Sequence, residues 1–362
     1  MYYTLYLLTF SFMASIHASP SYTFDDVLIR PQYSEINSRD EVDTSIEIVP
    51  GLRLSNPIMS ANMQTVNSVA LCVKISELGG LATVDQFRSI EEEANMIKEI
   101  KKQNAKIAGA IGASKDFMER AEAVISAGAD LIIMDTPHAH NLLTKNAIKS
   151  FKTKFKDIPL IVGNIATKEA ALFLTHHGVD GIKVGVGPGA ACLTRVNTGV
   201  GAPQITAIME CYEVAKNHGI GIIADGGVKT PGSFAKAIAA GGSAVYMGSV
   251  FAGTQESPGE VIEINGKKYK EYFGSSSETA KIRRAQSDKN YKENANRFIE
   301  GDYGYTKFQG TVQDVVEKYI MGLKSAMSYV GAKNIREFQD RTVFTVITQN
   351  GVVENGAHGL AA

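Results

Sequence analysis

The sequence predicts an α/β fold, a (β/α)8 TIM barrel with a long lid excursion after the eighth strand. Eight short apolar runs alternate with amphipathic, helix-like stretches after Ser21. Such alternation indicates a parallel sheet with right-handed crossovers, and eight units fit a closed barrel better than a doubly wound sheet. The runs begin at Pro57, Leu81, Lys106, Leu131, Pro159, Gly181, Gly221 and Ala244.

Several of these runs end in Asn, Asp, Gly or Ser, at the strand ends where barrel loops carry function. The functional face is therefore expected to include Asn62, Asp135, Asn164, the loop around Cys192, Asp225 and Ser249. Helix signals lie between the runs. Ser89 is expected to cap the helix that "SIEEEANMIKEIKKQ" predicts, with acidic residues in its first turn.

A polar segment from about Gly253 to Gly310 separates the eighth run from a final helical stretch, "TVQDVVEKYIMGLKSAMSYVG". Segments of this length inside a compact domain are usually lids or disordered. Within the segment, Asn265-Gly266 is a hairpin turn signal. We expect residues 21–362 to form one domain with a lid at about 253–310.

Residues 1–20 are expected to be an N-terminal extension. The apolar stretch from Tyr3 to Ala14 is signal-like, but no Lys or Arg precedes it and it is too short to span a bilayer. An extra arm, or an upstream start codon with Met13 as an alternative beginning, is preferred to a signal peptide.

Composition narrows the class of partner. The 362-residue chain has a formal net charge of −1 and a pI of about 6.7, so it offers no global positive field for nucleic acid or an anionic membrane. A small molecule is the expected partner. The three cysteines are an odd number without a CxxC pair, which argues against disulfides and structural zinc and favours a reducing, cytoplasmic compartment.

The stretch "GVGPGA" from Gly185 to Ala190 satisfies the GxGxxG/A pattern of dinucleotide-binding folds. That pattern needs a helix at once and an acidic residue about 20 positions later, whereas "CLTRVNTGVGAP" follows. The stretch is better interpreted as a glycine-rich loop whose backbone approaches a ligand, with Cys192 at its end. The alternative is a tight turn with a buried cysteine.

Two more glycine-rich strand ends follow the seventh and eighth runs, where barrels usually bind phosphate. They supply Gly226 and Gly227, then Gly248 and Ser249, and Pro231-Gly232 opens a helix whose N-terminus favours an anion. The alternative is a pair of ordinary turns. Asp225 is a candidate for binding ribose hydroxyls, or else a helix cap.

Other chemistry-bearing residues are less informative. His138 and His140 in "DTPHAH" have a spacing seen at metal sites, but no third ligand stands beside them, and solvated loop histidines are commoner. Glu300 lies in the lid, where a lone glutamate is usually a surface charge unless it meets Cys192.

Together these motifs resemble the IMP dehydrogenase/GMP reductase family. The stretch "GVGPGAACLTR" matches the family loop apart from Ala190, where serine is usual. Supporting stretches include "TFDDVLIRP", "NPIMSANMQTV", "IVGNIAT", "IADGGVKTPGSFAKAIAAG" and "MGSVFAGTQESPGE", over about Ser21 to Asp340.

The resemblance implies roles for particular residues. Cys192 would be the nucleophile that bonds purine C2, with Thr194 and Glu300 as its acid/base pair. Asp135 and Asn164 would face the nicotinamide cofactor. The alternative is that these two residues only cap helices or form turns. Substrate and phosphate contacts would be Asn62, Gly189, Asp225, Gly226, Gly227, Gly248, Ser249, Tyr272, Gly274 and Ser275. A potassium or other monovalent cation would bind backbone carbonyls of Gly187, Gly189 and Cys192.

Within the family, four features favour GMP reductase of the bacterial branch. They are Asn62 in "SANMQTV", the absence of an inserted regulatory domain before "KIAGAIG", a lid without the dehydrogenase's Arg-Tyr pair, and the stretch from "VFAGTQ" to "GSSSE". The expected activity is NADPH-dependent reductive deamination of GMP to IMP and ammonia, in nucleotide salvage, by a homotetramer. One alternative is an IMP dehydrogenase without its regulatory domain, because "NGVVENGAHG" near the C-terminus resembles the tail of the dehydrogenases. The other is a non-catalytic purine-nucleotide-binding barrel.

Overall fold

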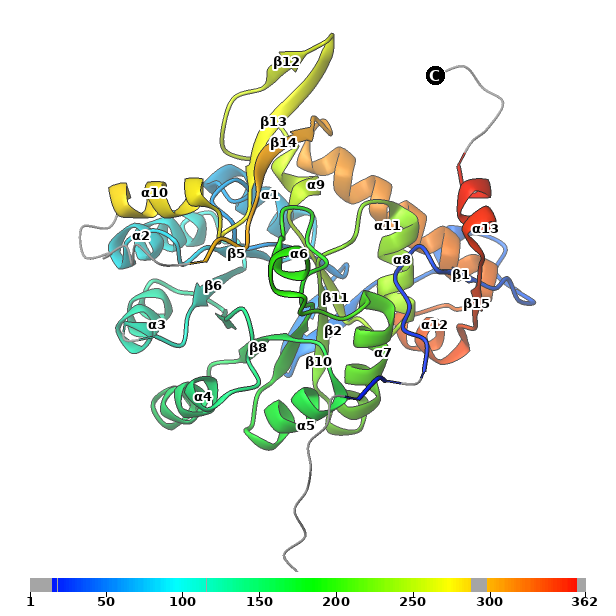
Figure 1. Cartoon of the computed structure of the whole chain (residues 1–362), viewed down its shortest axis with the longest axis horizontal. Coiled ribbons are helices and arrows are strands. Elements are labelled where there is room, and N and C mark those ends of the chain that lie inside the picture. Colours follow the sequence, from blue (N-terminus) through cyan, green and yellow to red (C-terminus); the bar gives the residue numbers. More distant parts are fainter. Residues whose placement is uncertain (1–14, 18, 115, 288–297, 357–362) are drawn as a thin grey trace, which may run out of the picture.

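An eight-stranded parallel barrel forms the centre of the molecule (Figure 1). The computed structural model describes residues 15–17, 19–114, 116–287 and 298–356. The predicted extension 1–20 therefore lies almost entirely outside the described residues. The barrel strands are β4 (Ile58–Ser60), β5 (Ala82–Val84), β6 (Ile107–Ile111), β7 (Leu131–Asp135), β8 (Leu160–Ile165), β9 (Gly181–Val184), β10 (Gly221–Asp225) and β11 (Ala244–Met247).

Each strand pairs in parallel with its neighbours, in the order β4-β11-β10-β9-β8-β7-β6-β5. The sheet closes between its first and last strands, because Met59 and Leu81 form a parallel bridge and the Leu81 amide donates to the Ile58 carbonyl at 3.0 Å. Closure leaves no unpaired edge. The predicted (β/α)8 class and all eight predicted strand positions are confirmed.

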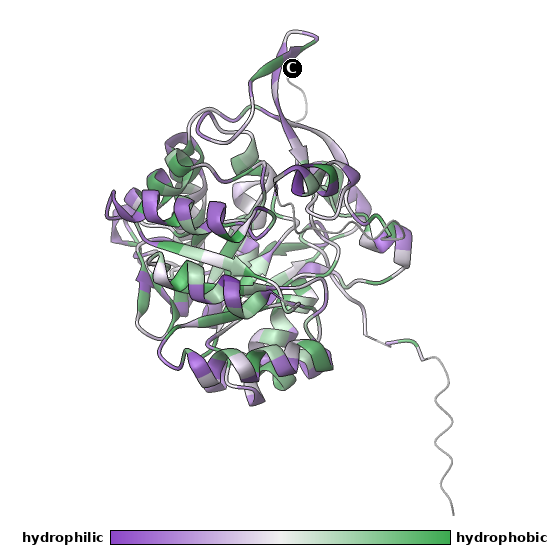
Figure 2. Ribbon diagram, turned by 90° about the vertical axis from the view of Figure 1, so that its left-hand side faces the viewer, coloured by the Kyte–Doolittle hydropathy of each residue, from purple (hydrophilic) through white to green (hydrophobic). Residues whose placement is uncertain are grey.

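Helices surround the barrel and turn their polar faces outward (Figure 2). Ser89 caps α2 and forms a capping box with Glu92, as the sequence predicted. The helices that follow the eight strands in turn are α1 (Val69–Glu77), α2 (Ile90–Lys101), α3 (Phe117–Ser126), α4 (Leu142–Lys154), α5 (Lys168–His176), α7 (Gln204–Ala215), α8 (Pro231–Ala239) and α11 (Val312–Val330).

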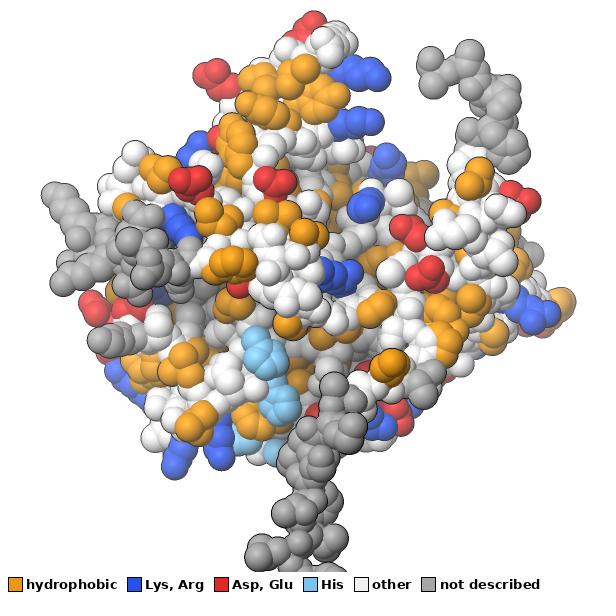
Figure 3. All heavy atoms as spheres, viewed as in Figure 1, with side chains coloured by type: hydrophobic (Ala, Val, Ile, Leu, Met, Phe, Trp, Pro, Cys, Tyr) orange, Lys and Arg blue, Asp and Glu red, His pale blue; other side chains and the backbone are white. Residues whose placement is uncertain are grey.

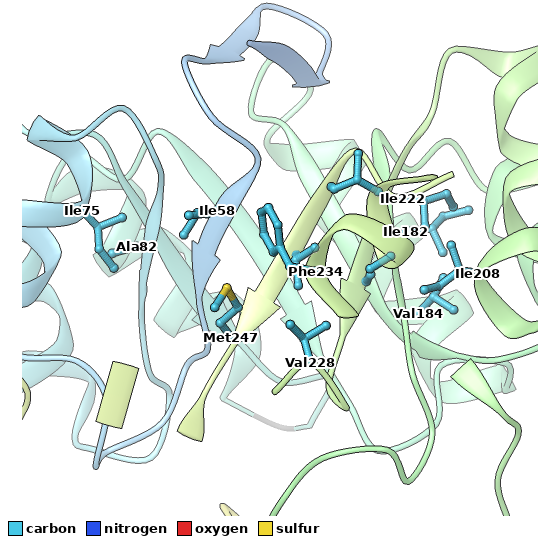
Figure 4. Close-up of a cluster of buried hydrophobic side chains, with 14 of the residues drawn as sticks. Ile58, Ile75, Ala82, Ile182, Val184, Ile208, Ile222, Val228, Phe234 and Met247 are labelled. Carbon is cyan, nitrogen blue, oxygen red and sulfur yellow. The ribbon is translucent and has the colours of Figure 1, made fainter. Parts of the chain in front are cut away.

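Two separate hydrophobic cores result. The larger core lies between the strands and the helices, and Figure 4 shows part of it, including Ile182, Ile222 and Phe234. The smaller core fills the barrel and continues into the hairpin of β2 (Ile46–Val49) and β3 (Leu52–Leu54). Ile48 on this hairpin is fully buried, so the hairpin closes the end of the barrel where the strands begin.

The described part of the excursion after β11 includes a small sheet that projects from the barrel (Figure 1). The predicted hairpin is present, and Asn265 and Gly266 both adopt positive φ, as its tight turn requires. The elements of the excursion are α9 (Ser249–Ala252), β12 (Ile262–Ile264), β13 (Lys267–Phe273), α10 (Glu278–Ser287) and β14 (Tyr303–Lys307).

The two ends of the described chain meet beside the barrel. Strand β1 (Val27–Ile29) pairs antiparallel with β15 (Phe344–Val346), which follows α12 (Ile335–Arg341) and precedes α13 (Gln349–Glu354). The remaining short elements are α6 (Thr194–Thr198) and the 3-10 turns Arg39–Glu41 and Lys216–His218.

Substituting Phe234 tests the larger core. The side chain is fully buried and meets Tyr319 edge to face, with ring centroids 5.7 Å apart. Phe234→Ala is expected to lower the free energy of unfolding by about 3–5 kcal/mol, because it creates a cavity in a packed layer. Urea denaturation measures the loss. The exposed control Leu142→Ala should change stability by about 0.5 kcal/mol or less.

Candidate active site

A cavity of about 670 Å³ opens at the carboxyl ends of the barrel strands. The structure places every site residue predicted from the sequence in its wall. The strand ends contribute Asn62, Asp135, Asn164 and Asp225, and the loops contribute Gly187, Gly189, Cys192, Thr194, Gly226, Gly227, Gly248 and Ser249. The excursion contributes Tyr272, Gly274, Ser275 and Glu300.

The loop from Gly185 to Arg195 carries the cysteine, and its shape depends on glycine. Gly185 has φ +155°, and a Cβ there would lie 2.0 Å from the Asp225 carbonyl oxygen. Gly187 has φ +84° and lies against the Arg195 side chain. The Arg195 guanidinium in turn donates to the Val186 carbonyl at 3.3 Å, so the loop is held from both ends.

Cys192, Thr194 and Glu300 form a continuous hydrogen-bonded group. The Cys192 thiol lies 3.2 Å from the Thr194 hydroxyl, which donates to the Glu300 carboxylate at 2.7 Å. Backbone pairing fixes the two segments, because the Leu193 amide donates to the Glu300 carbonyl at 2.8 Å and Cys192 bridges Gly301. A thiol, a hydroxyl and a carboxylate in this order can move a proton to or from a group bound at the sulfur.

The other two cysteines differ sharply from Cys192. Cys72 and Cys211 are fully buried, and burial raises the pKa of both thiols far above its ordinary value. Cys192 is partly exposed and faces the cavity. Since the thiolate is the reactive form of cysteine, Cys192 is the candidate nucleophile.

The two glycine-rich turns after β10 and β11 bring backbone close to the cysteine loop and to the excursion. A Cβ at Gly226 would lie 3.0 Å from the Gly189 amide nitrogen, and a Cβ at Gly248 would lie 2.9 Å from the Tyr272 hydroxyl. Gly274 likewise approaches the Ala191 carbonyl. The turns therefore leave the cavity wall as bare backbone, a surface suited to a phosphate group.

A buried lysine that the sequence reasoning missed connects both sides of the cavity. Lys183 on β9 is 2% exposed, and its ammonium lies 2.8 Å from the Asp135 carboxylate and 2.5 Å from that of Asp225. It also lies over the Tyr246 ring, 5.0 Å from the centroid. The sequence did carry a signal for this buried lysine, since Lys183 is the one charged residue within the apolar run "GIKVGVG".

The two neighbouring carboxylates keep the Lys183 ammonium charged. Burial alone would lower the pKa of Lys183, but Asp135 and Asp225 outweigh that effect, and the pKa is raised. Each carboxylate also accepts from an asparagine amide, Asp135 from Asn62 at 2.8 Å and Asp225 from Asn164 at 2.9 Å. Asp225 is therefore held by Lys183 and Asn164 and does not cap a helix.

A buried contact between an arginine and a glutamate lies beside the cavity, between α2 and α3. The Arg120 guanidinium donates to the Glu93 carboxyl group at 2.6 Å, and neither side chain is exposed by more than 2%. Burial raises the pKa of Glu93 to about 8, although Arg120 opposes the shift. Sequence reasoning missed this pair, because α2 and α3 each read as ordinary amphipathic helices.

His138 lies in the wall of the cavity, and His140 lies beside it. Figure 3 shows several histidine side chains gathered on this face of the molecule. The ring centroids of His138 and His140 are 6.2 Å apart, and His140 packs against Phe173. Within the described residues, no group of three or more His, Cys, Asp or Glu side chains is arranged to hold a metal ion. The predicted cation at the backbone carbonyls of the cysteine loop stays a prediction.

An eight-stranded barrel with a cysteine-centred cavity at the carboxyl ends of its strands defines a (β/α)8-barrel enzyme. The family model described as "IMP dehydrogenase / GMP reductase domain" matches residues 21–358. The chain belongs to this family of oxidoreductases of purine metabolism.

The similar proteins include both IMP dehydrogenases and a GMP reductase. Inosine-5'-monophosphate dehydrogenase of Cryptosporidium parvum is 34% identical over 93% of this chain and 94% of its own length. The enzyme of that name from Methanocaldococcus jannaschii is 33% identical over 95% and 96%. A cysteine-to-alanine variant of Trypanosoma brucei GMP reductase, in complex with guanosine 5'-monophosphate, superposes with a TM-score of 0.90 at 28% identity, covering 95% of this chain and 99% of that one.

No helix in the described part of the chain has the length and apolar character needed to cross a membrane.

Replacing Lys183 tests the link between the two carboxylates. Lys183→Met keeps an unbranched apolar side chain but removes the ammonium, and so leaves Asp135 and Asp225 facing each other without a cation. We expect the free energy of unfolding to fall by about 2–4 kcal/mol, less than for a fully buried pair because both carboxylates are partly exposed. Lys183→Arg, which keeps the charge, should lose less. Equal urea midpoints for Lys183→Met and the wild type would contradict this assignment.

Glu93 predicts a pH dependence of stability. Its folded pKa of about 8 exceeds the ordinary 4.5, so the folded chain holds a proton there that the unfolded chain releases. The stability from this group is therefore complete below pH 4.5 and is lost as the pH rises through about 8. Urea midpoints between pH 5 and pH 8.5 should fall less steeply in Glu93→Gln than in the wild type. Parallel pH profiles would show that Glu93 does not titrate in this range.

Proposed function

We propose that this chain is a GMP reductase that converts GMP to IMP and ammonia with NADPH. The observation that carries the proposal is the group formed by Cys192, Thr194 and Glu300, at hydrogen-bond distances of 3.2 and 2.7 Å. It supplies a nucleophile together with a path for protons. The GMP complex of the Trypanosoma brucei reductase, which shares this fold, supports a guanine nucleotide as the ligand.

The nucleotide would enter with its phosphate at the glycine-rich turns. Gly226, Gly227, Gly248 and Ser249 line one side of the cavity as backbone and a hydroxyl, and Tyr272, Gly274 and Ser275 close it from the excursion. Asp225 also lines the cavity, where it would accept from ribose hydroxyls. Asn62 and Gly189 complete the substrate contacts.

The reaction would proceed in two balanced steps. The Cys192 thiolate adds to C2 of the guanine, the bond from C2 to the exocyclic nitrogen breaks, and ammonia leaves with a proton delivered through Thr194 and Glu300. C2 then receives a hydride from NADPH, the C2–sulfur bond breaks, and the thiolate is regenerated. In sum, GMP, NADPH and two protons give IMP, NADP+ and ammonium.

The residues present fit a nicotinamide cofactor, whose chemistry is to supply the hydride. The Asn164 side-chain oxygen is buried at the cavity wall, and within the described residues no donor meets it. It could accept from the carboxamide of a nicotinamide. Asp135 on the neighbouring strand would accept from the nicotinamide ribose, and Lys183 would hold both carboxylates in place.

A potassium ion at the carbonyls of Gly187, Gly189 and Cys192 belongs to the same proposal. Positive φ at Gly187 turns this loop sharply, and the Gly189 carbonyl accepts from the Cys192 amide at 3.1 Å. A cation there would stabilise the loop that carries the thiol. A carbonyl oxygen has two lone pairs, so the Gly189 oxygen could contact a cation in addition to the Cys192 amide.

IMP dehydrogenase is the second candidate, because the curated relatives carry that name. Both activities use the same thiol and the same purine carbon. The dehydrogenase would take hydride from IMP to NAD and hydrolyse the adduct to XMP.

We also propose a homotetramer in the cytoplasm. The projecting sheet exposes apolar side chains, visible at the top of Figure 3, that an assembly would cover; they include Val261, Ile264, Tyr303 and Tyr305. The free cysteines fit a reducing compartment.

Absorbance at 340 nm tests the activity with two substrate pairs, GMP with NADPH and IMP with NAD. We expect a loss of absorbance with the first pair, abolished in Cys192→Ala and reduced about 10²–10⁴-fold in Thr194→Val and Glu300→Gln. Cys211→Ala is the matched control and should keep its activity. A rise with IMP and NAD would identify a dehydrogenase, and no change with either pair would favour a nucleotide-binding protein without turnover.

A further inference from the structure

The short segment that precedes β1 is fixed at both of its ends. The Tyr22 carbonyl accepts from the amide of Ile205, in the first turn of α7, at 3.0 Å. The Asp26 carbonyl accepts from the Ile347 amide, just after β15, at 2.9 Å. Phe24 lies between these two anchors, so its side chain projects from a backbone that is held on either side. In Figure 1 this segment is the dark blue trace beside α7 and α8.

The Phe24 ring lies behind the wall of the cavity. The side chain is 5% exposed and is not itself part of the wall, and the Lys236 ammonium of α8 donates to the Phe24 carbonyl at 2.8 Å. A Cβ at Gly227 would lie 3.3 Å from Cε2 of the ring and 3.3 Å from Cβ of Pro188. Gly227 belongs to the glycine-rich turn after β10, and Pro188 belongs to the cysteine loop. Phe24 therefore packs where the two loops meet.

Packing decides how far apart these loops stand at that point. At the strand ends they are bridged, because the Gln204 amide donates to the Val184 carbonyl at 2.9 Å and to the Asp225 carbonyl at 3.0 Å. Farther out, at Pro188 and Gly227, no hydrogen bond joins the two loops within the described residues. Their separation there depends on van der Waals contact, in which a missing partner leaves a gap.

We propose that Phe24 is a positioning residue of the active site, which sets the separation between the cysteine loop and the glycine-rich turn after β10. The inference rests on the proposed function, in which one nucleotide reaches from that turn to Cys192. A ligand that touches two loops at once binds tightly only when both already stand in the right place. Without the ring, the nucleotide itself would have to order the loops, and its affinity would fall.

The proposed cofactor contacts depend on other supports. Asp135 and Asn164 lie on β7 and β8, and the Lys183 ammonium lies 2.8 Å from the Asp135 carboxylate. Phe24 does not pack at these strand ends. Its loss should therefore weaken binding of the nucleotide and leave the cofactor side unchanged. This selectivity separates a positioning role from a general contribution to stability.

The test measures how IMP protects Cys192 of the full chain from alkylation by iodoacetamide. IMP is a ligand in both candidate activities, and the other two cysteines are buried. We expect the Kd of IMP to rise about threefold in Phe24→Leu and about tenfold or more in Phe24→Ala. With GMP and NADPH as substrates, the KM of GMP should rise in parallel, and the KM of NADPH should change less than about twofold.

Phe151→Leu and Phe151→Ala are the matched controls. Phe151 is fully buried on α4 and lies outside the cavity wall, so these variants should lose stability in urea and keep the Kd of IMP within about twofold. If Phe24→Ala does not fold, the comparison of Phe24→Leu with Phe151→Leu decides.

An unchanged Kd of IMP in the Phe24 variants would overturn the proposal and leave Phe24 as a core residue alone. Equal losses of affinity in the Phe24 and Phe151 variants would also overturn it, because they would reflect general destabilisation. The wild type reports on the proposed function separately. A wild type that neither IMP nor GMP protects would refute that function and this inference together, whereas protection that no Phe24 variant weakens would refute this inference alone.

Discussion

The site depends on one buried interaction, the ammonium of Lys183 between the carboxylates of Asp135 and Asp225. The two carboxylates end strands β7 and β10, with β8 and β9 between them. Without a cation, two carboxylates at one mouth of a barrel would repel each other. The Lys183 ammonium offsets both negative charges and fixes the separation of the two carboxylates. It thereby ties the side of the cavity that would hold the substrate to the side that would hold the cofactor.

The cysteines show how burial selects one reactive group. All three are free thiols, but Cys72 and Cys211 are enclosed by apolar side chains that oppose ionisation. Cys192 stays partly exposed because its glycine-rich loop leaves the strand at the open end of the barrel. Backbone pairing of Leu193 with Glu300 and of Cys192 with Gly301 holds Glu300 close to the cysteine.

Local patterns in the sequence predicted the barrel, its eight strands and the part of the cavity wall at the strand ends. The residues that the excursion contributes to the wall were implied by the family resemblance instead. The prediction at the strand ends succeeded because parallel strands bring their carboxyl ends to one face, so Asp135 and Asp225 had to lie near each other. The pairings across the barrel could not be predicted in the same way. Lys183 points inward, whereas its neighbours Ile182 and Val184 face the helices, and a single run of apolar residues does not reveal which face is which. Arg120 and Glu93 meet only through helix packing.

The candidate nucleophile and the carboxylate hydrogen-bonded to it through Thr194 belong to different parts of the chain. Cys192 sits on the barrel, while Glu300 arrives on a contiguous excursion that begins after β11 and returns before α11. The same excursion supplies Tyr272, Lys281 and Arg284 to the cavity. Exchange of this one contiguous segment would therefore change the residues that face Cys192 while the barrel strands stay the same. The excursion is the part of the fold in which related chains could differ in the chemistry of one shared cavity.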